Sequence, residues 1–342
     1  EALDASIAAY RDGLARLDSA PSAGAPPDQL ARTRALLQVA LANALGRTSA
    51  PDAERADLLT GAVSILRPLA TATPTRDNRW ALARALTNLG EYFFGSGDDV
   101  GRALATLDEA AAQWRAILET RPSDSLVRHD LAGTEYWRAT ALRSLKRDAE
   151  ADAAWNESAR HYGFLVEADP TDRRAALGLA RVLEATGNAV RTANPALAVE
   201  RFAAAVVALD RFRPEAQRDT ALLRIQGSCQ YLLARTLLTL TPPDAPRAID
   251  TVRRAYATFD ALDRIAPGDE EFTRRRLADS AQVWMAALNA LPEGEAAPSG
   301  AAMEDASAAI AATLARWNAA GTSAEGSKAH TRLVELVAAM RM

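Results

Sequence analysis

The residue types that most often carry out chemistry are few in this chain and lie far apart. The histidines are His129, His161 and His330, and the single cysteine is Cys229. A zinc site needs several ligands at short spacings, and neither an HxxxH nor an HxxE spacing occurs here. Cys229 falls in an apolar helical pattern, which favours a buried, unreactive thiol over a nucleophile. These residues therefore predict no metal site and no cysteine chemistry.

Two short segments have the composition of ligand-binding loops without the rest of the motif. The glycine-rich run at 95–101 carries two aspartates, lacks a lysine and follows a predicted helix, whereas a phosphate-binding loop follows a strand and ends in Gly-Lys-Ser/Thr. The acidic run at 269–271 is interpreted as the first turn of a helix, where carboxylates are favoured by the helix dipole. We therefore expect no bound cofactor and no enzyme active site in this segment.

Composition narrows the remaining classes of function. The 342 residues carry a net charge of −4 with both signs interspersed, so there is no basic surface of the kind that binds nucleic acid. The longest apolar runs, such as residues 202–209, are far shorter than the roughly 20 residues that span a bilayer. The first residue is Glu1, from which we expect the segment to have been cut from a longer polypeptide.

A landmark recurs along the chain and predicts stacked structural units. Prolines at 74, 122, 170, 214 and 267 are separated by 48, 48, 44 and 53 residues. Four of them are followed eight to ten residues later by a Leu-Ala pair: Leu82-Ala83, Leu131-Ala132, Leu179-Ala180 and Leu277-Ala278. Repeats of this length share their core between neighbouring units. The chain is thus expected to be an elongated array rather than a single globule.

Within each repeat the apolar spacing is that of an amphipathic helix pair. Three second helices match at one phase and place an aromatic residue, Trp114, Tyr162 or Phe259, eight residues before the proline. Pro-x-Asp triplets at 122–124, 170–172 and 267–269 stop one helix and cap the next. Further helices are predicted at about 2–19, 28–46, 52–70, 301–318 and 326–340. The expected domains are residues 1–75, a repeat array at 76–291, and a linker with capping helices at 292–342.

The repeat at 76–120 resembles the tetratricopeptide repeat. The matching residues are Leu86, Leu89, Gly90, Phe93, Gly97, Asp98, Ala103, Leu107 and Ala110, and the glycine recurs as Gly187 with Ala139 in the repeat between. The resemblance implies an all-α, right-handed solenoid of helical hairpins over about residues 76–290. The repeat that contains Pro214 departs from the pattern, because prolines at 242, 243 and 246 interrupt its turn.

The second helix of each repeat runs on by about a dozen residues beyond the usual length. This longer form, with Asp-Pro-x-Asp at 169–172, resembles the solenoid tails of bacterial transmembrane serine/threonine kinases. The resemblance implies the sensory or docking part of a larger signalling protein. If it holds, the location is periplasmic or otherwise outside the cytoplasm; if not, it is cytoplasmic.

In tetratricopeptide folds, partners usually bind a concave face built by the first helix of each hairpin. Carried over position by position, the resemblance implies the partner-binding residues Arg84, Thr87, Glu91, Tyr136, Thr140, Arg143, Arg181, Glu184, Asn188, Arg191, Ser228, Tyr231, Arg235, Asp279 and Gln282. The cluster of Arg143, Arg181, Arg191 and Arg235 is the strongest part of this prediction, because arginine is enriched at binding hot spots. The alternative is an ordinary solvated helix face with intrahelical ion pairs.

The predicted function is recognition of a protein or peptide segment without catalysis. A concave face lined with arginine favours an acidic or carboxy-terminal segment as the partner. Two alternatives remain open at this stage. One is a small-ligand or oligosaccharide sensor with a pocket between the terminal helices and the array, and the other is a structural scaffold that self-assembles through the helix at 2–19.

Overall fold

The computed structural model describes residues 2–19, 26–48, 52–97, 99–212, 219–266, 270–291, 296–319 and 328–340. All of its regular secondary structure in these ranges is helical, in fourteen α-helices packed as successive antiparallel hairpins. The predicted all-α solenoid of helical hairpins is therefore confirmed. Prolines 214 and 267 and the cap predicted at Asp269 lie outside the described residues.

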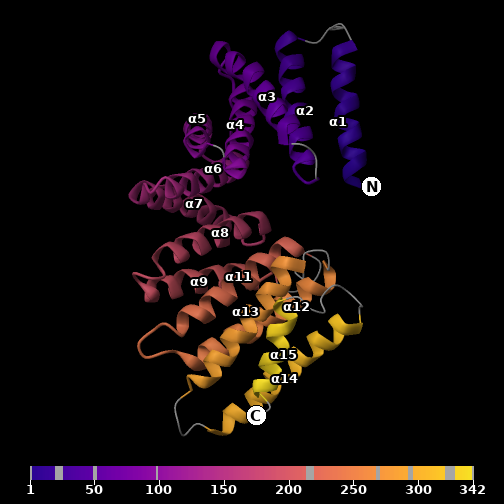
Figure 1. The fold of residues 1–342 in the computed structure, drawn as a ribbon. Coiled ribbons are helices and arrows are strands. Elements are labelled where there is room, and N and C mark those ends of the chain that lie inside the picture. The colour runs from indigo at the N-terminus through magenta and orange to yellow at the C-terminus, as the bar shows by residue number, and fades with distance from the viewer. Residues whose placement is uncertain are drawn as a thin grey trace. The chain divides into compact units, whose positions relative to one another are not determined.

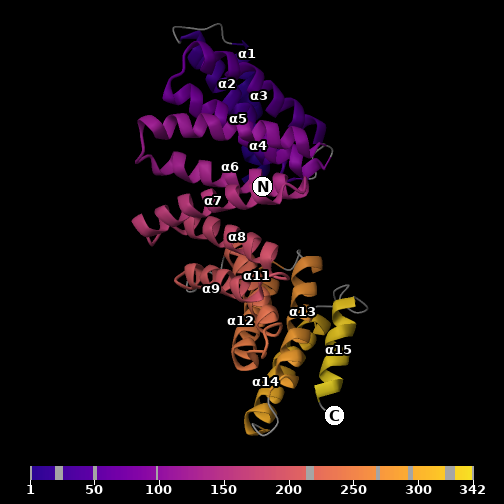
Figure 2. The same cartoon turned by 90° about the vertical axis from the view of Figure 1, so that its left-hand side faces the viewer.

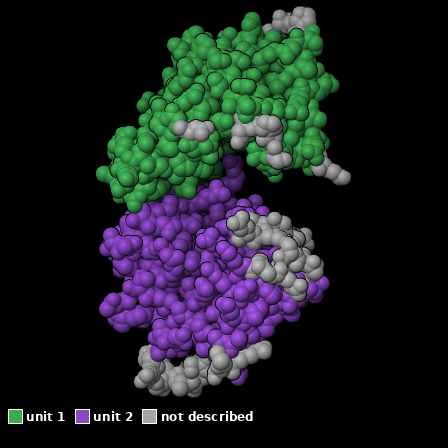
Figure 3. Space-filling model, in the orientation of Figure 1, with its two compact units in different colours: residues 1–170 green, residues 171–342 purple. Residues whose placement is uncertain are grey.

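The chain divides into two compact units, residues 1–170 and 171–342, which are coloured separately in Figure 3. The helices of the first unit are α1 (Ala2–Ser19), α2 (Pro27–Leu45), α3 (Asp52–Ala72), α4 (Arg76–Ser96), α5 (Val100–Thr120), α6 (Ser125–Ser144) and α7 (Asp148–Ala168). Each packs on the next in chain order, as Figures 1 and 2 show.

The second unit continues the same plan and then departs from it at its carboxy-terminal end. Its helices are α8 (Arg173–Val190), α9 (Pro195–Asp210), α11 (Thr220–Leu237), α12 (Ala245–Ile265), α13 (Glu270–Asn289), α14 (Ala296–Ala319) and α15 (Lys328–Met340). Consecutive helices pack together from α8 to α13 (Figure 1), but α13 then packs on both α14 and α15. The division predicted from repeat type, at residues 75 and 291, stays a prediction.

Short polar side chains begin the helices and tie neighbouring repeats together. Asp124 and Asp172 accept hydrogen bonds from the backbone N–H groups of Val127 and Ala175 at 3.1 and 3.0 Å, as the Pro-x-Asp pattern predicts. Asp124 also receives Arg76 from the preceding repeat at 2.9 Å. The unit 2 equivalents, Arg173 and Asp219, make the same pair. The cap thus fixes both the helix start and the register between repeats.

The hairpins close by packing a small residue of one helix against a large residue of the next. Trp114, Tyr162 and Phe259 are 1%, 5% and 0% exposed, which confirms them as core residues. A Cβ atom added at Gly187 would lie 2.6 Å from Phe202 Cε1, closer than real atoms approach. Glycine is therefore required where α8 and α9 meet.

Gly187→Ala and Gly163→Ala are expected to change stability in opposite directions. The first forces a rigid aromatic ring to move, and overpacking of this kind costs about 1–3 kcal/mol. Gly163 lies within α7 with no atom within 4 Å of its added Cβ, so alanine there gains helix propensity of about 1 kcal/mol. Urea denaturation of the two variants checks this. A stabilised Gly187→Ala variant would contradict the packing described.

Alternate helices form the inner side of each unit. In unit 1 the direct contacts join α2 to α4 and α4 to α6, and in unit 2 they join α8 to α11 and α11 to α13. Stacked hairpins curve toward the helices that approach one another, which form the concave side of the stack. We call α8, α11 and α13 the inner helices of unit 2. They are the helices that carry most of the predicted partner-binding residues.

The carboxy-terminal end differs in detail from the prediction. The predicted linker at 292–300 is shorter, because α14 begins at Ala296 rather than at about residue 301. Proline is tolerated in the first turn of a helix, where its missing N–H has no intrahelical partner in any case, so Pro298 does not delay the helix start. Residues 292–295 lie outside the described residues.

Candidate binding surface on the inner helices of unit 2

Tyr231 lies at the centre of an arginine-rich surface made by the inner helices of unit 2. Its ring is 5% exposed, and its hydroxyl oxygen is 3.4 Å from Arg235 Nη1 on the same helix. The Arg276 guanidinium of α13 lies 5.2 Å from the Tyr231 ring centroid, in cation–π geometry. The tyrosine thus holds two guanidinium groups from different helices around one ring.

The arginines of this surface carry charge that no described carboxylate neutralises at ion-pair distance. They are Arg181 of α8, Arg191 immediately after α8, Arg235 of α11 and Arg276 of α13, and we call them the arginine surface. The pKa of Arg191 is lowered by its partial burial and then by the charge of Arg235. Two like charges therefore lie near each other. An anion placed between them would relieve that repulsion.

Glu184 is the acidic member of this surface and is held partly buried on α8. Burial raises the pKa of Glu184 to about 7, although the charges of Arg276 and Arg181 act in the opposite direction. Its carboxyl group is therefore about half protonated at neutral pH. Behind it, burial raises the pKa of the Cys229 thiol well above its usual range, and Glu184 adds to that rise. The cysteine is buried, as predicted.

Glu184→Gln is expected to stabilise the protein at high pH and to have little effect at low pH. The folded pKa of about 7 lies above the ordinary 4.5, so the wild-type carboxyl has no net effect on folding below pH 4.5, opposes it increasingly between pH 4.5 and 7, and opposes it fully above pH 7. The gain from the amide should approach about 1–3 kcal/mol at pH 8. Urea denaturation across pH 4–8 measures it, with the exposed Glu200→Gln as control. A pH-independent difference from wild type would contradict the assignment.

The other predicted residues of unit 2 fall at the edge of the arginine surface or beneath it. Asn188 and Gln282 are exposed on α8 and α13, whereas Ser228 is buried in α11. Asp279 is already engaged by α15, since Arg332 Nη1 lies 3.4 Å from its Oδ1. Arg276 was missed by sequence reasoning. Arg276 lies one helical turn before Asp279, so extending the repeat register of the last repeat by one turn would have identified it.

The predicted residues of unit 1 are mostly engaged within that unit. The Thr87 hydroxyl lies 2.9 Å from Thr134 Oγ1 and receives Trp114 Nε1 at 3.3 Å, so it joins three helices in the core. The Thr140 hydroxyl donates a hydrogen bond to the backbone oxygen of Tyr136 on the same helix. Arg143 Nη1 pairs with Asp148 Oδ1 at 3.1 Å across the α6–α7 turn. Arg143 is therefore engaged by a carboxylate of its own unit.

Unit 1 presents aromatic as well as charged groups on its inner helices. The Phe94 and Trp137 ring centroids are 5.8 Å apart, and Tyr136 packs edge-on to Trp137 at 5.5 Å. Arg84 is exposed and lies 5.2 Å from the Trp80 ring centroid, while Glu91 is partly buried. These residues combine aromatic rings with single charges of both signs.

The remaining candidates for chemistry have structural surroundings. His161 is 6% exposed, and burial together with the charges of Arg160 and Arg128 lowers its pKa to about 4, so the ring is neutral at pH 7. Across the described ranges, no group of three or more His, Cys, Asp or Glu side chains is placed to hold a metal ion. None of the helices found there is both long and apolar enough to traverse a bilayer.

Comparison with solved structures places the fold among known helical-repeat proteins. The chain is similar to the nuclear import adaptor Nro1 of S. pombe, with a TM-score of 0.59 and 14% identity over 90% of this chain and 99% of that one. A second Nro1 structure, described as a hypoxic regulator of sterol synthesis and nuclear import adaptor, gives 0.63 and 12% over 97% of both chains. No family model and no curated protein matches the sequence. At these identities the likeness shows the fold alone.

Proposed function

We propose that the chain is a protein-binding scaffold that holds an extended acidic segment of a partner on the arginine surface of unit 2. The observation that carries this proposal is the set of four arginines, Arg181, Arg191, Arg235 and Arg276, that make no ion pair with a described carboxylate, two of which repel one another. Arginine clusters on preformed surfaces recognise acidic motifs and terminal carboxylates through charge-assisted, often bidentate hydrogen bonds. The similarity in fold to an adaptor protein supports binding rather than catalysis.

The part of the arginine surface around Tyr231 is held in place before a partner binds. Tyr231 is 5% exposed and contacts Arg235 through its hydroxyl and Arg276 through its ring, so these two arginines lose little side-chain entropy when a partner binds. The protonation state of Glu184 determines how the affinity for an acidic ligand changes with pH. Its ionised form competes with an acidic ligand for the same guanidinium groups, so binding should strengthen as this carboxyl is protonated.

A panel of fluorescent 12-residue peptides tests the proposal on the whole chain. Acidic, neutral and basic versions, each with a free or an amidated carboxy terminus, are titrated by fluorescence anisotropy at two salt concentrations. We expect the acidic peptides to bind at least tenfold more tightly than the neutral ones and to weaken as salt rises. Equal binding of acidic and basic peptides would contradict the proposal. A preference for the free carboxylate would identify a carboxy-terminal segment as the partner.

The sequence resemblance to the solenoid tails of bacterial serine/threonine kinases suggests the larger protein in which this scaffold functions. In that setting the scaffold is the docking or sensory region of a larger bacterial signalling protein. A partner held on the arginine surface would then be brought close to the rest of that protein. This extension does not alter the chemistry proposed for the surface itself.

A further inference from the structure

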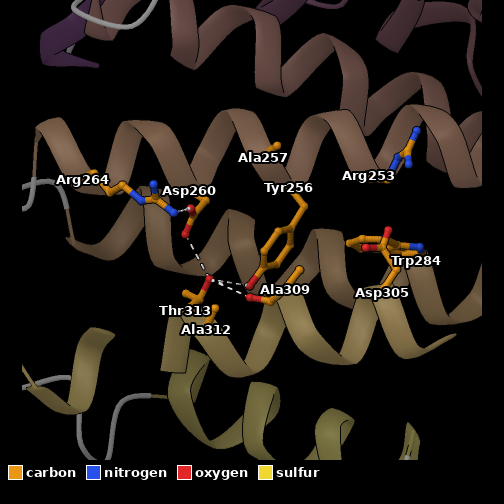
Figure 4. A pocket seen from close by; sticks show the side chains of 10 residues that line it. All are labelled: Arg253, Tyr256, Ala257, Asp260, Arg264, Trp284, Asp305, Ala309, Ala312 and Thr313. Carbon is orange, nitrogen blue, oxygen red and sulfur yellow. Dashed lines mark hydrogen bonds and ion pairs between the residues drawn. The ribbon is translucent and has the colours of Figure 1, made fainter. Parts of the chain in front are cut away.

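The regular packing of the repeats fails at one place within unit 2, between α12, α13 and α14. Helix α14 packs on α13 and α15, and it is tied to α12 by a chain of side-chain hydrogen bonds. Tyr256 donates to Thr313 Oγ1 at 2.9 Å, and Thr313 donates to Asp260 Oδ1 at 3.0 Å (Figure 4). A contact made by long polar side chains leaves room that close helix packing would fill.

That room is an open pocket within unit 2. One part, of about 340 Å³, lies between Tyr256, Asp260 and α14, and a second part of about 500 Å³ continues toward Pro246 and Ile249. Arg253, Trp284 and Asp305 line both parts, and all three are labelled in Figure 4. The wall from α14 consists largely of alanines, which are too small to reach across. The volume is in the range of small-ligand sites.

Two polar groups of the pocket have no partner among the described residues. Trp284 is 2% exposed, and its indole Nε1–H has no hydrogen-bond acceptor there. The exposed carboxylate of Asp305 likewise makes no ion pair or hydrogen bond with a described residue. A buried donor left unsatisfied costs about 1–3 kcal/mol, so the N–H group of Trp284 calls for an explanation.

The other carboxylates around the pocket are already paired. Asp250 pairs with Arg253 and Arg254 at 3.1 and 3.0 Å, and Asp260 receives Arg264 and Arg316 at 2.5 and 2.7 Å. Asp305 is therefore the one lining carboxylate without a partner among the described residues, and Trp284 contributes an indole N–H that lacks an acceptor there. Arg253 lies close by and can turn a donor toward the same space. A matching ligand carries a cation and, next to it, an oxygen that accepts hydrogen bonds.

We propose that this pocket binds an α-ammonium group with its neighbouring carboxylate or carbonyl oxygen. The ammonium group would pair with Asp305, and the oxygen would accept from Trp284 Nε1 and Arg253. A free amino acid and the amino terminus of a short peptide share this chemistry. The site is separate from the arginine surface in the residues it uses, so neither proposal depends on the other.

Calorimetric titration of the whole chain tests the pocket. The probes are the twenty common amino acids at concentrations up to about 10 mM. Each one that binds is followed by its amide, its N-acetyl derivative and a dipeptide that begins with it. We expect the N-acetyl derivative, which lacks the ammonium group, to bind at least tenfold more weakly. Equal binding of the amide and dipeptide would identify a peptide amino terminus, and binding of the free acid alone would identify an amino acid. Both outcomes support the site.

Two variants and a matched control locate the binding. Asp305→Asn should weaken it at least tenfold, Trp284→Phe should weaken it severalfold, and Glu304→Gln, at the exposed neighbouring residue of α14, should leave it unchanged. The indole N–H resonance of Trp284, assigned by its loss in Trp284→Phe, should shift when the ligand binds. This resonance shift tests the site even if Trp284→Phe is destabilised.

Three results would overturn the proposal. The first is that none of the amino acids or dipeptides binds. The second is that Asp305→Asn binds as tightly as wild type. The third is that maltose, a sugar with no cation for Asp305, binds in their place.

Discussion

Arg191→Glu combined with Arg235→Glu is expected to weaken binding of an acidic 12-residue peptide at least 100-fold, or about 2.7 kcal/mol. The two guanidinium groups lie near enough for Arg235 to lower the pKa of Arg191, so both should face the same segment of the ligand. Reversing them replaces two attractions by two repulsions on a partly desolvated surface, where charges interact more strongly than in bulk water. Fluorescence anisotropy with the acidic peptide measures the change.

Arg247→Glu is the matched control for this double variant. Arg247 is exposed in the first turns of α12, which is not one of the inner helices, and its reversal changes the net charge in the same direction. We expect it to weaken binding by less than about threefold, through the long-range field alone. If Arg247→Glu weakened binding as much as each single inner reversal does, net charge rather than the arginine surface would govern recognition.

Trp114→Ala is expected to lower the free energy of unfolding by about 3–5 kcal/mol, the usual cost of emptying a large aromatic site. Trp114 is 1% exposed, packs with Ile117, Val127 and Leu131, and donates through Nε1 to Thr134 Oγ1 at 3.1 Å. Its loss would leave both a cavity and an unsatisfied hydroxyl network between three helices. Urea denaturation followed by circular dichroism reports the change.

Trp80→Ala provides the comparison, because Trp80 is only partly buried and has Arg84 over one face. We expect it to cost about 1–2 kcal/mol, from reduced burial of apolar area. Equal effects of the two substitutions would mean that the aromatic residue placed eight positions before each proline is not the main element of hairpin packing.

The fold could be predicted from local signals that repeat. The cap at Asp172 and the glycine at Gly187 follow from short-range chemistry, since a helix needs a donor-satisfying side chain at its start and two helices need a small residue where they cross. The aromatic residue at Phe259 could be placed because it recurs at a fixed distance from the proline. Three repetitions of the same pattern made each of these predictions stronger than it would be alone.

The candidate surface could be predicted only in part. Arg191, Arg235 and Tyr231 were found because the repeat register carried over to α8 and α11. Arg276 was missed because its place beside Tyr231 depends on how α13 packs against α11, a contact between segments about 45 residues apart in sequence. Residues such as Thr87 have hydroxyls that the core already uses, and sequence position alone does not distinguish an inner face from an inter-helix contact.

The pocket could not be predicted from the repeat pattern. It exists because α14 follows a segment without repeat landmarks and docks through Thr313 and Arg316 instead of a small-to-large helix crossing. No local pattern reports the distance between two helices joined by long polar side chains. The sequence predicted a terminal cap and left open a pocket beneath it, but gave no means of naming Trp284 or Asp305 as its lining.

Photo-crosslinking from the two helices of one hairpin tests the central claim most directly. A benzoylphenylalanine is placed at Asn188, exposed on the inner helix α8, or at Val207, which is 67% exposed on its neighbour α9. The acidic peptide is then added to the whole chain and irradiated. Strong crosslinking from residue 188 and little from residue 207 is the result predicted for a partner held on the inner helices. Equal or stronger crosslinking from residue 207 would contradict it.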